Sequence, residues 1–581
     1  MLAIGLSLVA LVSIARAQTS YYYDVNGATS GSGVTANATY SWTTATGNWS
    51  TSAGGTAAAA NWVNGNSVAI FSAGTDAAND PYTLNLGANL NFRSITVEEG
   101  LVTVALGATN TLSVSNGTST FNVAGNQSLT LTGSRATPQL VLGTRSLVVT
   151  GAGDTTLAVG LSGSNTNALL KSGTGTLALS GNNTFTGSVV VSSGTLEVGA
   201  NAPSGAAGAL GNASSAVLLG NTTTGVNDSS LLLAQSGITI GRAITATNNG
   251  TGVMTIGGGI TTGTGNFSGT VTLNRAATFT AAGDSTITFN GTVAGTGALT
   301  KTGTGEVALT GSTANTQTGN VTVADGTLSL GKTAGTNALG TTNLTVGDGT
   351  GAAGSAILRF DADNQLANTT AVTLAADGLF NVNGRTETIA SIAGAGEIQI
   401  GAGQLVSAGD TSTEFSGQLT GNGTFTKQGL GTLTLSAATI NYGGTFELNG
   451  GTLLLSSTTA SFDTLSVTGN TTLDFGGTAS SLSLSTLTIA NGVTLTIANW
   501  TEGVDALYAL TWTNGTYDTR GTTPMTQIVF GGFTANDTRW LSVDNQITPV
   551  PEPSTYGALL FATLLGGFGW RRWRARLTQK L

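Results

Sequence analysis

A short pattern, Gly-Thr followed by alternating apolar residues, recurs along the middle of the chain at a nearly fixed interval. Two neighbouring copies begin at Gly175 and Gly194, 19 residues apart, and two others begin at Gly431 and Gly451, 20 residues apart. Alternation with period two is typical of a strand with one buried face. A sequence period of about 20 residues indicates a solenoid, in which each coil buries its apolar face only against its neighbours.

The interval between copies also distinguishes between β architectures. A β-sandwich would need antiparallel hairpins, for which a nearly constant coil length has no physical reason. Asn and Gly are frequent between the expected strands and supply the left-handed backbone that tight corners need. The predicted fold class is therefore all-β, a parallel β-helix.

Three longer blocks, near 169–199, 299–331 and 425–455, repeat a common arrangement. In each, a lysine (Lys171, Lys301 and Lys427) precedes a glycine-rich turn and one of the Gly-Thr or Gly-Glu strands. Recurrence at one place in the repeat suggests a structural or solubilising role for these lysines. The blocks resemble the autotransporter-associated β-strand repeat, a resemblance that implies an extracellular β-helical passenger. The third block departs from the pattern at 437–442, so we expect a different corner there.

The N-terminus has the features of a secretory signal peptide over residues 1–17. An apolar run from Leu2 to Val12 leads to Ala15-Arg16-Ala17, an A-x-A pattern that predicts cleavage before Gln18. No basic residue precedes the apolar run, and a buried N-terminal strand is the alternative.

The C-terminus, residues 550–581, combines a short motif, an apolar stretch and a basic end. Pro551-Glu552-Pro553 is followed by an apolar segment over 556–570, for which a short hydrophobic helix is predicted. At about 1.5 Å per residue such a helix is short for a bilayer, and the basic cluster would stay in the cytoplasm. The basic stop consists of Arg571, Arg572, Arg574 and Arg576.

These three parts, in this order, resemble the PEP-CTERM sorting signal. The resemblance implies an exosortase-type enzyme as partner, membrane attachment through the C-terminal helix before processing, and transient anchoring in the inner membrane. A plain C-terminal membrane anchor is the alternative, and it also leaves the body of the protein outside.

Aromatic residues gather at both ends of the repeat array. A solenoid needs atypical end coils to hide its open core, so we predict cap regions at 18–90 and 501–549 around a β-helix over 91–500. Stacking on sugar rings is the alternative role of these tryptophans. They are Trp42, Trp49 and Trp62 before the array, and Trp500, Trp512 and Trp540 after it.

Composition removes several classes of function. The chain has no Cys and no His, so thiolate zinc sites, Cys nucleophiles and imidazole bases are excluded, and no cofactor or metal is predicted. Charged residues make up 8% of the chain and its net charge is −9. Nucleic acid is not expected as a partner, because its binding requires clustered Lys and Arg.

Two motifs could carry chemistry. Arg359, Asp361 and Asp363 would share one face of a strand, with the two carboxyl groups about 7 Å apart, near the separation in inverting glycosidases. An exposed ion pair is the competing interpretation. Gly326 to Thr333 fits the Walker A pattern, but its first five residues form a repeat strand, whereas a phosphate loop must lie between a strand and a helix.

The sequence therefore predicts a non-enzymatic, exported protein of the cell surface or extracellular space, structural or adhesive, and associated with the envelope or with extracellular polysaccharide. We predict no catalytic residues. A β-helix polysaccharide lyase or glycoside hydrolase centred on Asp361 and Asp363 is the first alternative. A glycan-binding adhesin that uses the terminal tryptophans is the second.

Overall fold

The computed structural model describes residues 18–512, 523–541 and 543–550. This part of the chain is a parallel β-solenoid of about 20 turns with almost no helix, which confirms the predicted fold class. Two short 3-10 segments, η1 (Met525–Gln527) and η2 (Ala535–Asp537), are the helical elements of the described residues. The chain forms two compact units: one reaches Leu299 and includes Gly305–Val307, and the other contains Thr300–Thr304 and the chain from Ala308 onward.

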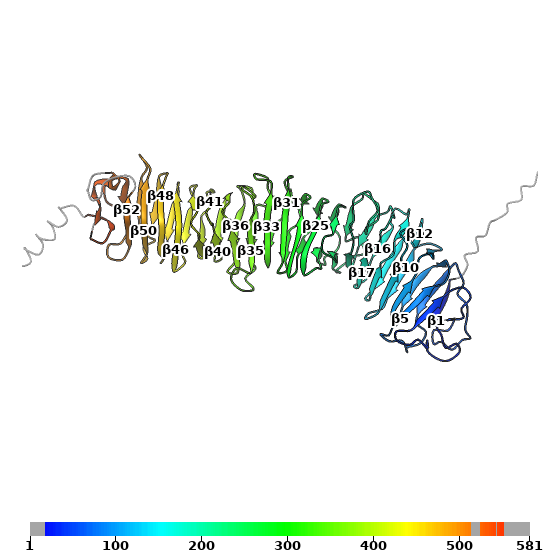
Figure 1. The fold of residues 1–581 in the computed structure, drawn as a ribbon. Coiled ribbons are helices and arrows are strands. Elements are labelled where there is room, and N and C mark those ends of the chain that lie inside the picture. Colours follow the sequence, from blue (N-terminus) through cyan, green and yellow to red (C-terminus); the bar gives the residue numbers. More distant parts are fainter. Residues whose placement is uncertain (1–17, 513–522, 542, 551–581) are drawn as a thin grey trace, which may run out of the picture. The chain divides into compact units, whose positions relative to one another are not determined.

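The N-terminal unit winds through sheets of mainly parallel strands, the first of which holds 12 strands and ends in the antiparallel pair β1–β3. In Figure 1 these strands run from blue at β1 to green. In spatial order the first sheet contains β29 (Val293–Gly295), β26 (Val271–Leu273), β23 (Ile244–Ala246), β20 (Val217–Leu219), β18 (Val189–Val191), β16 (Leu169–Lys171), β13 (Leu147–Gly151), β10 (Ser119–Val123), β7 (Ser94–Val97), β4 (Ser67–Phe71), β1 (Thr19–Tyr23) and β3 (Trp49–Ser50).

Two further series of strands complete the coils of this unit. The second series contains β2 (Thr39–Trp42), β5 (Pro81–Leu86), β8 (Leu101–Ala105), β11 (Ser128–Thr132), β14 (Asp154–Leu157), β17 (Thr176–Leu179), β19 (Gly194–Val198), β21 (Ser229–Leu233), β24 (Met254–Gly258) and β27 (Ala277–Thr280). The third contains β6 (Leu90–Phe92), β9 (Leu112–Val114), β12 (Leu140–Gly143) and β15 (Leu161–Gly163), then β22 (Thr239–Ile240), β25 (Thr262–Phe267) and β28 (Asp284–Phe289).

The chain passes from one unit to the other through β30 (Leu299–Thr302) and β31 (Glu306–Gly311). In the C-terminal unit one series contains β32 (Val321–Val323), β34 (Asn343–Val346), β36 (Ala371–Leu374), β39 (Ser391–Gly394), β42 (Thr413–Phe415), β45 (Thr432–Leu435), β47 (Thr452–Leu455), β49 (Thr471–Asp474), β51 (Leu495–Ala498) and β53 (Ile528–Phe530). A second contains β33 (Gly326–Lys332), β35 (Ala356–Phe360), β37 (Gly378–Asn381), β40 (Glu397–Gln399) and β43 (Gln418–Thr420).

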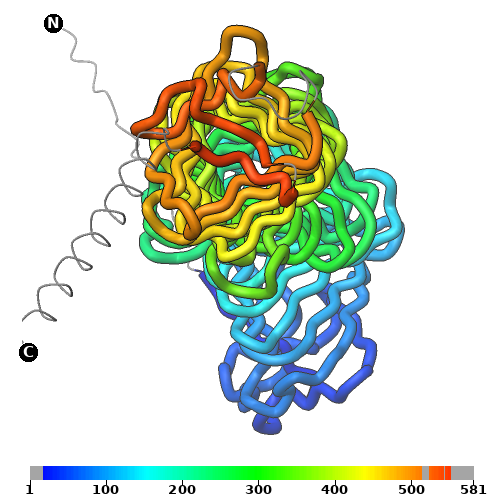
Figure 2. Tube along the Cα trace, turned by 90° about the vertical axis from the view of Figure 1, so that its left-hand side faces the viewer, coloured from blue at the N-terminus to red at the C-terminus, as the bar shows by residue number. Residues whose placement is uncertain are grey.

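The third sheet of the C-terminal unit contains its longest strands. In spatial order it holds β38 (Thr386–Ile389), β41 (Gln404–Ser407), β44 (Thr424–Lys427), β46 (Thr439–Leu448), β48 (Thr459–Val467), β50 (Ser481–Ile489), β52 (Ala506–Trp512), β55 (Gln546–Pro549) and β54 (Thr538–Leu541). Figure 2 shows the coils of this unit, green to red, wound one behind another.

Strand register explains the sequence period. Thr176 pairs with Thr195, and Thr432 pairs with Thr452, so each Gly-Thr strand lies beside the copy one coil away. Their inward residues, among them Leu177 and Leu453, are fully buried. Burying one leucine contributes about 2 kcal/mol, and because every coil repeats the burial, the stack is stable where a single coil would not be.

Left-handed corners connect the strands, as the Asn and Gly content predicts. Asn126 has a φ of 63° and Asn383 a φ of 54°. A short polar side chain that bonds locally makes this conformation less costly for Asn than for most residues.

The N-terminal end is closed by an aromatic cluster. Trp42, Trp49 and Trp62 are buried, with ring centroids 5.0–5.3 Å apart. Tyr23 and Phe71 pack against Trp49 at 5.1 and 5.7 Å. Buried rings cannot stack on a sugar, so the alternative role proposed for these three tryptophans is wrong. Parallel pairing already begins inside this region, between β1 and β4.

At the other end the chain turns back on itself. β54 and β55 pair in antiparallel orientation, and the buried Trp540 donates its indole N–H to the Ala509 carbonyl at 2.9 Å. Trp500 packs edge-on against Phe475 and Phe530, both at 5.1 Å. These tryptophans are packing residues. The boundaries of the two cap regions stay a prediction.

Both targeting segments lie outside the described residues: the signal peptide with Ala15 and Ala17, and the tail from Pro551, including its predicted hydrophobic helix. Gln18 is the first described residue. In the ranges that are described, none of the helices has the length and apolarity that crossing a bilayer requires.

Candidate functional site

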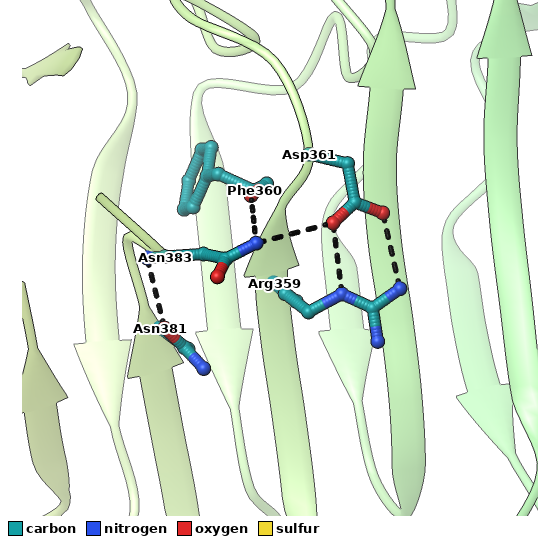
Figure 3. Close-up of polar contacts among 5 residues, drawn as sticks. All are labelled: Arg359, Phe360, Asp361, Asn381 and Asn383. Atoms are coloured by element: carbon teal, nitrogen blue, oxygen red, sulfur yellow. Dashed lines mark hydrogen bonds and ion pairs between the residues drawn. The ribbon is translucent and has the colours of Figure 1, made fainter. Parts of the chain in front are cut away.

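Arg359 and Asp361, the predicted catalytic candidates, form a two-point ion pair. Arg359 is on β35, whereas Asp361 follows the end of that strand. The guanidinium donates from Nε to Asp361 Oδ1 at 2.9 Å and from Nη2 to Oδ2 at 3.0 Å, and about a third of each side chain is exposed. Figure 3 shows the pair with Asn383, whose Nδ2 donates to the Phe360 carbonyl at 3.0 Å and to Asp361 Oδ1 at 3.4 Å.

Asp363 is engaged elsewhere. Its Oδ1 accepts a hydrogen bond from the backbone N–H of Thr386, one coil away, at 2.9 Å. The expectation that Asp361 and Asp363 share a strand face is wrong, because β35 ends at Phe360 and both carboxylates lie in the turn that follows. Each carboxylate therefore has its own partner: Arg359 for Asp361, and the Thr386 amide for Asp363.

The recurring lysines define the best-built polar site of the fold, which we call the lysine corner. Lys171, Lys301 and Lys427 are 0–3% exposed. Each ammonium donates to the carbonyl of the glycine two residues later: Gly173 and Gly303 at 2.7 Å, and Gly429 at 2.9 Å. The solubilising role is therefore wrong for these lysines, and the structural role is confirmed.

Each lysine corner also reaches the next coil. The second carbonyl belongs to the residue just before the following glycine of the pattern: Ser193 at 3.2 Å, Asp325 at 2.8 Å and Gly450 at 3.5 Å. Hydrogen bonds from an ionised donor are roughly twice as strong as neutral ones. The ammonium thus joins two successive coils.

Glycine is required beside the lysine. Gly194 and Gly451 have φ values of 73° and 65°, and a Cβ there would lie 2.6 and 2.8 Å from the Nζ of Lys171 and Lys427. A Cβ at Gly194 would lie closer still to the carbonyl oxygens of Gly173 and Gly175, and one at Gly451 closer to those of Gly429 and Gly431. The left-handed φ and these backbone contacts, with the lysine beside them, explain why the Gly-Thr strand begins with glycine where it follows a lysine corner. Burial lowers the pKa of Lys171 to about 8 and also lowers the pKa of Lys427.

A second contact recurs in the first two blocks and is replaced by a different one in the third. Asn183 and Asn315 are buried, and their Nδ2 groups donate to the carbonyls of Ala209 and Ala338 at 2.6 and 2.7 Å. In the third block the corresponding stretch is part of the continuous strand β46, where Tyr442 donates its hydroxyl to the Gly423 carbonyl at 2.7 Å. The predicted difference at 437–442 is confirmed.

The Walker-like segment is a strand rather than a phosphate loop. Gly326 to Lys332 form β33, and the buried Lys332 donates its ammonium to the Thr310 carbonyl at 2.8 Å. Its backbone amides belong to a sheet. The segment does not have the strand–loop–helix geometry that phosphate binding requires.

Sequence reasoning missed the buried Glu387. Its Oε2 accepts the N–H groups of Gln365 and Leu366 at 2.6 and 3.3 Å, and burial raises the pKa of its carboxyl to about 7. Glu387 and Ile389 both point inward on β38. A charged residue at an inward position of the alternation was the available signal, and the same signal marks the three lysines.

Comparisons with known families agree with this architecture. The passenger-associated-transport-repeat model matches residues 169–198, 299–330 and 425–455, the three blocks that contain the lysine corners. The model of the PEP-CTERM protein-sorting motif matches residues 549–574, which include Pro551, Glu552, Pro553 and the first three arginines of the basic stop. No curated protein and no solved structure matches the chain.

The fold and its corners define a class, a repeat protein built as a parallel β-solenoid. More particularly, the chain carries three passenger-associated-transport repeats and a PEP-CTERM signal, so it is an exported protein of the cell surface or extracellular space that an exosortase sorts.

Proposed function

We propose that this protein acts without catalysis, as a structural or adhesive element of the cell envelope or of the extracellular polysaccharide around the cell. One observation carries the proposal: the candidate residues that the sequence patterns single out hold the backbone or form a surface ion pair. Asp363 binds the Thr386 amide, Asp361 binds Arg359, and the repeat lysines bind carbonyls.

The outward face of the coils supports the same proposal. Threonine columns such as Thr445, Thr464 and Thr486 stand in register on neighbouring strands, and such surfaces offer hydrogen bonds without a reactive group. A repeated surface of this kind is suited to many weak contacts along a partner. We also propose that the C-terminal tail holds the chain in the inner membrane until it is processed.

Turnover and attachment can be measured on the processed protein. We expect no cleavage products from alginate, polygalacturonate or a neutral glucan, with or without calcium, and we expect a deletion strain to lose cell attachment or matrix cohesion. Asp463→Ala, at another exposed carboxylate, is the control for Asp361→Ala. Turnover that Asp361→Ala abolishes and Asp463→Ala leaves intact would support the lyase or hydrolase alternative and reject our proposal.

Mass spectrometry of protein from the envelope and the culture medium tests the sorting step. We expect a mature C-terminus close to Pro551–Pro553. An intact chain through Arg571 to Leu581 in both fractions would contradict processing and would indicate a permanent anchor.

A further inference from the structure

One outward surface of the C-terminal unit is made almost entirely of small hydroxyl and amide side chains, which we call the hydroxyl face. It lies on the first halves of β46, β48 and β50, and β52 adjoins it. Two columns of residues run across these strands in register. The columns are Thr439, Thr459, Ser481 and Ala506, and beside them Asn441, Ser461, Ser483 and Tyr508.

The hydroxyl face is held rigid from beneath. The residues that alternate with the two columns point inward and are buried, among them Tyr442, Phe462 and Leu484. Phe462 stacks on Phe446 with ring centroids 4.7 Å apart. Strands locked by such a core present their outward side chains at fixed positions, about 4.8 Å apart from one strand to the next. The columns are therefore a preformed array.

Most side chains of the hydroxyl face are free to bind. Thr439, Asn441, Thr459, Ser461 and Ser483 are exposed, and within the described chain the side chains of these five residues make no intramolecular hydrogen bond. Some hydroxyls farther along are engaged: Thr486 of β50 bonds to Thr511 of β52 at 2.9 Å, and Thr468, which follows β48, donates to Glu447 at 2.7 Å.

From this array we infer that the hydroxyl face binds an uncharged polysaccharide laid across the strands, with roughly one sugar ring per coil. The coil spacing is close to the length of one pyranose in an extended glycan. Hydroxyl and amide groups both donate and accept, as sugar hydroxyls do, and the Tyr508 ring at the end of its column offers an apolar surface for a sugar. β46, β48, β50 and β52 contain no Lys or Arg, so a polyanionic glycan would find no counter-charge.

The inference rests on the proposed function and specifies its ligand and surface. The test uses the full processed protein, with mannan and a neutral β-glucan as probes and alginate as the acidic comparison. Ser461→Arg places a long charged side chain in the middle of the array, and we expect it to weaken binding to the neutral probe at least about tenfold. Asn122→Arg, at an exposed outward position of β10, is the matched control and should bind as the wild type does.

Milder variants separate contact from misfolding. Thr459→Ala with Ser461→Ala removes two hydroxyl groups without adding bulk, and Tyr508→Ala removes the ring; we expect a loss of about threefold or more from each. If these variants unfold at the same temperature as the wild type, their fold is intact.

Three outcomes would overturn the inference. If the wild type binds a neutral glycan and Ser461→Arg binds it equally, the site is elsewhere, while the proposed function stands. Tighter binding to alginate than to the neutral probes would reject the ligand class. If the wild type binds no glycan and light scattering shows self-association that Ser461→Arg abolishes, the face is an interface between copies, and an adhesive role through glycan fails as well.

Discussion

The lysine corners and the aromatic cluster of the N-terminal end stabilise the solenoid in different ways, the corners between coils and the cluster at the end of the stack. At a corner such as Lys301, an ammonium binds the carbonyls of Gly303 and Asp325 on two successive coils. At the end, Trp42, Trp49 and Trp62 cover the first coil of the described stack, and their indole N–H groups have no partner among the described residues. The lysine corners supply hydrogen-bond donors to carbonyls inside the stack, whereas the aromatic cluster supplies apolar surface at its end.

This difference explains why one feature repeats and the other does not. Each interior coil has neighbours on both sides, so a corner that works once can work again in each repeat. The first coil of the described stack has a neighbour on one side, and large rings cover its open core with few residues. The comparison predicts that damage to the end cluster is the more costly and that damage to a corner stays local.

Removal of one end ring should have the largest effect. Trp49→Ala leaves a cavity among Trp42, Trp62 and Tyr23, and we expect it to reduce the local free energy of unfolding by about 3–5 kcal/mol. Hydrogen exchange measured by mass spectrometry should show faster exchange over β1 to β5 and unchanged exchange around Lys427. Trp49→Phe, which keeps an aromatic ring, should cost less. Uniform loosening of the whole chain would contradict an end-cap role.

Removal of a corner ammonium should have the next largest effect. Lys301→Met keeps a long side chain but leaves the half-buried carbonyls of Gly303 and Asp325 without their charged donor, at a cost of about 1–3 kcal/mol. The contact with the next coil lengthens from Lys301 to Lys171 to Lys427, so we expect the loss to fall in that order when each is replaced by Met. Exchange should rise within two coils of the site. Equal protection in all three variants would show that the corners do not join coils.

The third prediction concerns Glu387, a buried charge of the opposite sign that also binds backbone groups. Its folded pKa of about 7 lies above the ordinary value of 4.5, so the folded state holds the proton more tightly than the unfolded state. Its contribution to stability is present below about pH 4.5 and is lost as the pH rises toward 7, at up to about 1.4 kcal/mol per pH unit.

Glu387→Gln keeps an oxygen acceptor for the Gln365 amide and cannot ionise. The difference in unfolding temperature between this variant and the wild type should therefore grow in favour of the variant from pH 4.5 to pH 7 and then level off. Titration of the other carboxylates is common to both proteins and cancels in the difference. A difference that does not change with pH would mean that the carboxyl titrates at its ordinary value.

The smallest effect is expected at the surface pair. Asp361→Asn breaks the ion pair with Arg359, and because both side chains are about one-third exposed, the loss should be at most about 1 kcal/mol. Added salt should reduce the difference between variant and wild type in thermal unfolding. A loss as large as that of Lys301→Met would place Asp361 among the residues that hold the coils together.

Much of the fold follows from the spacing of residues alone. The alternation at Gly175-Thr176 and Gly194-Thr195 implies strands, and their separation implies a coil, because side-chain parity and coil length are local properties of the chain. The departure of the third block from the repeat pattern at 437–442 was also predictable from the sequence, and in the structure this stretch leads into the long strand β46. Lys171 and Glu387 both stand at positions where the strand alternation predicts a side chain that points inward. Their burial was therefore predictable, although a charged side chain is usually expected to be exposed.

The candidate site was less predictable. Arg359, Asp361 and Asp363 look like one strand face in the sequence, yet the strand ends at Phe360. Where a coil turns depends on the coils before and after it, and the partner of Asp363 is the amide of Thr386, 23 residues further on. No local pattern specifies which carboxylate meets which amide across a turn.

By itself the sequence determined the fold class, the repeating unit and the PEP-CTERM sorting motif, because each depends on residues close together in the chain. Only the tertiary structure decided what the polar residues do. Stacking brings carbonyls from successive coils to the same lysine, and it sets threonine and serine columns in register on one face of β46, β48 and β50. Both depend on register between coils, which is set by packing of the whole stack and not by any single repeat.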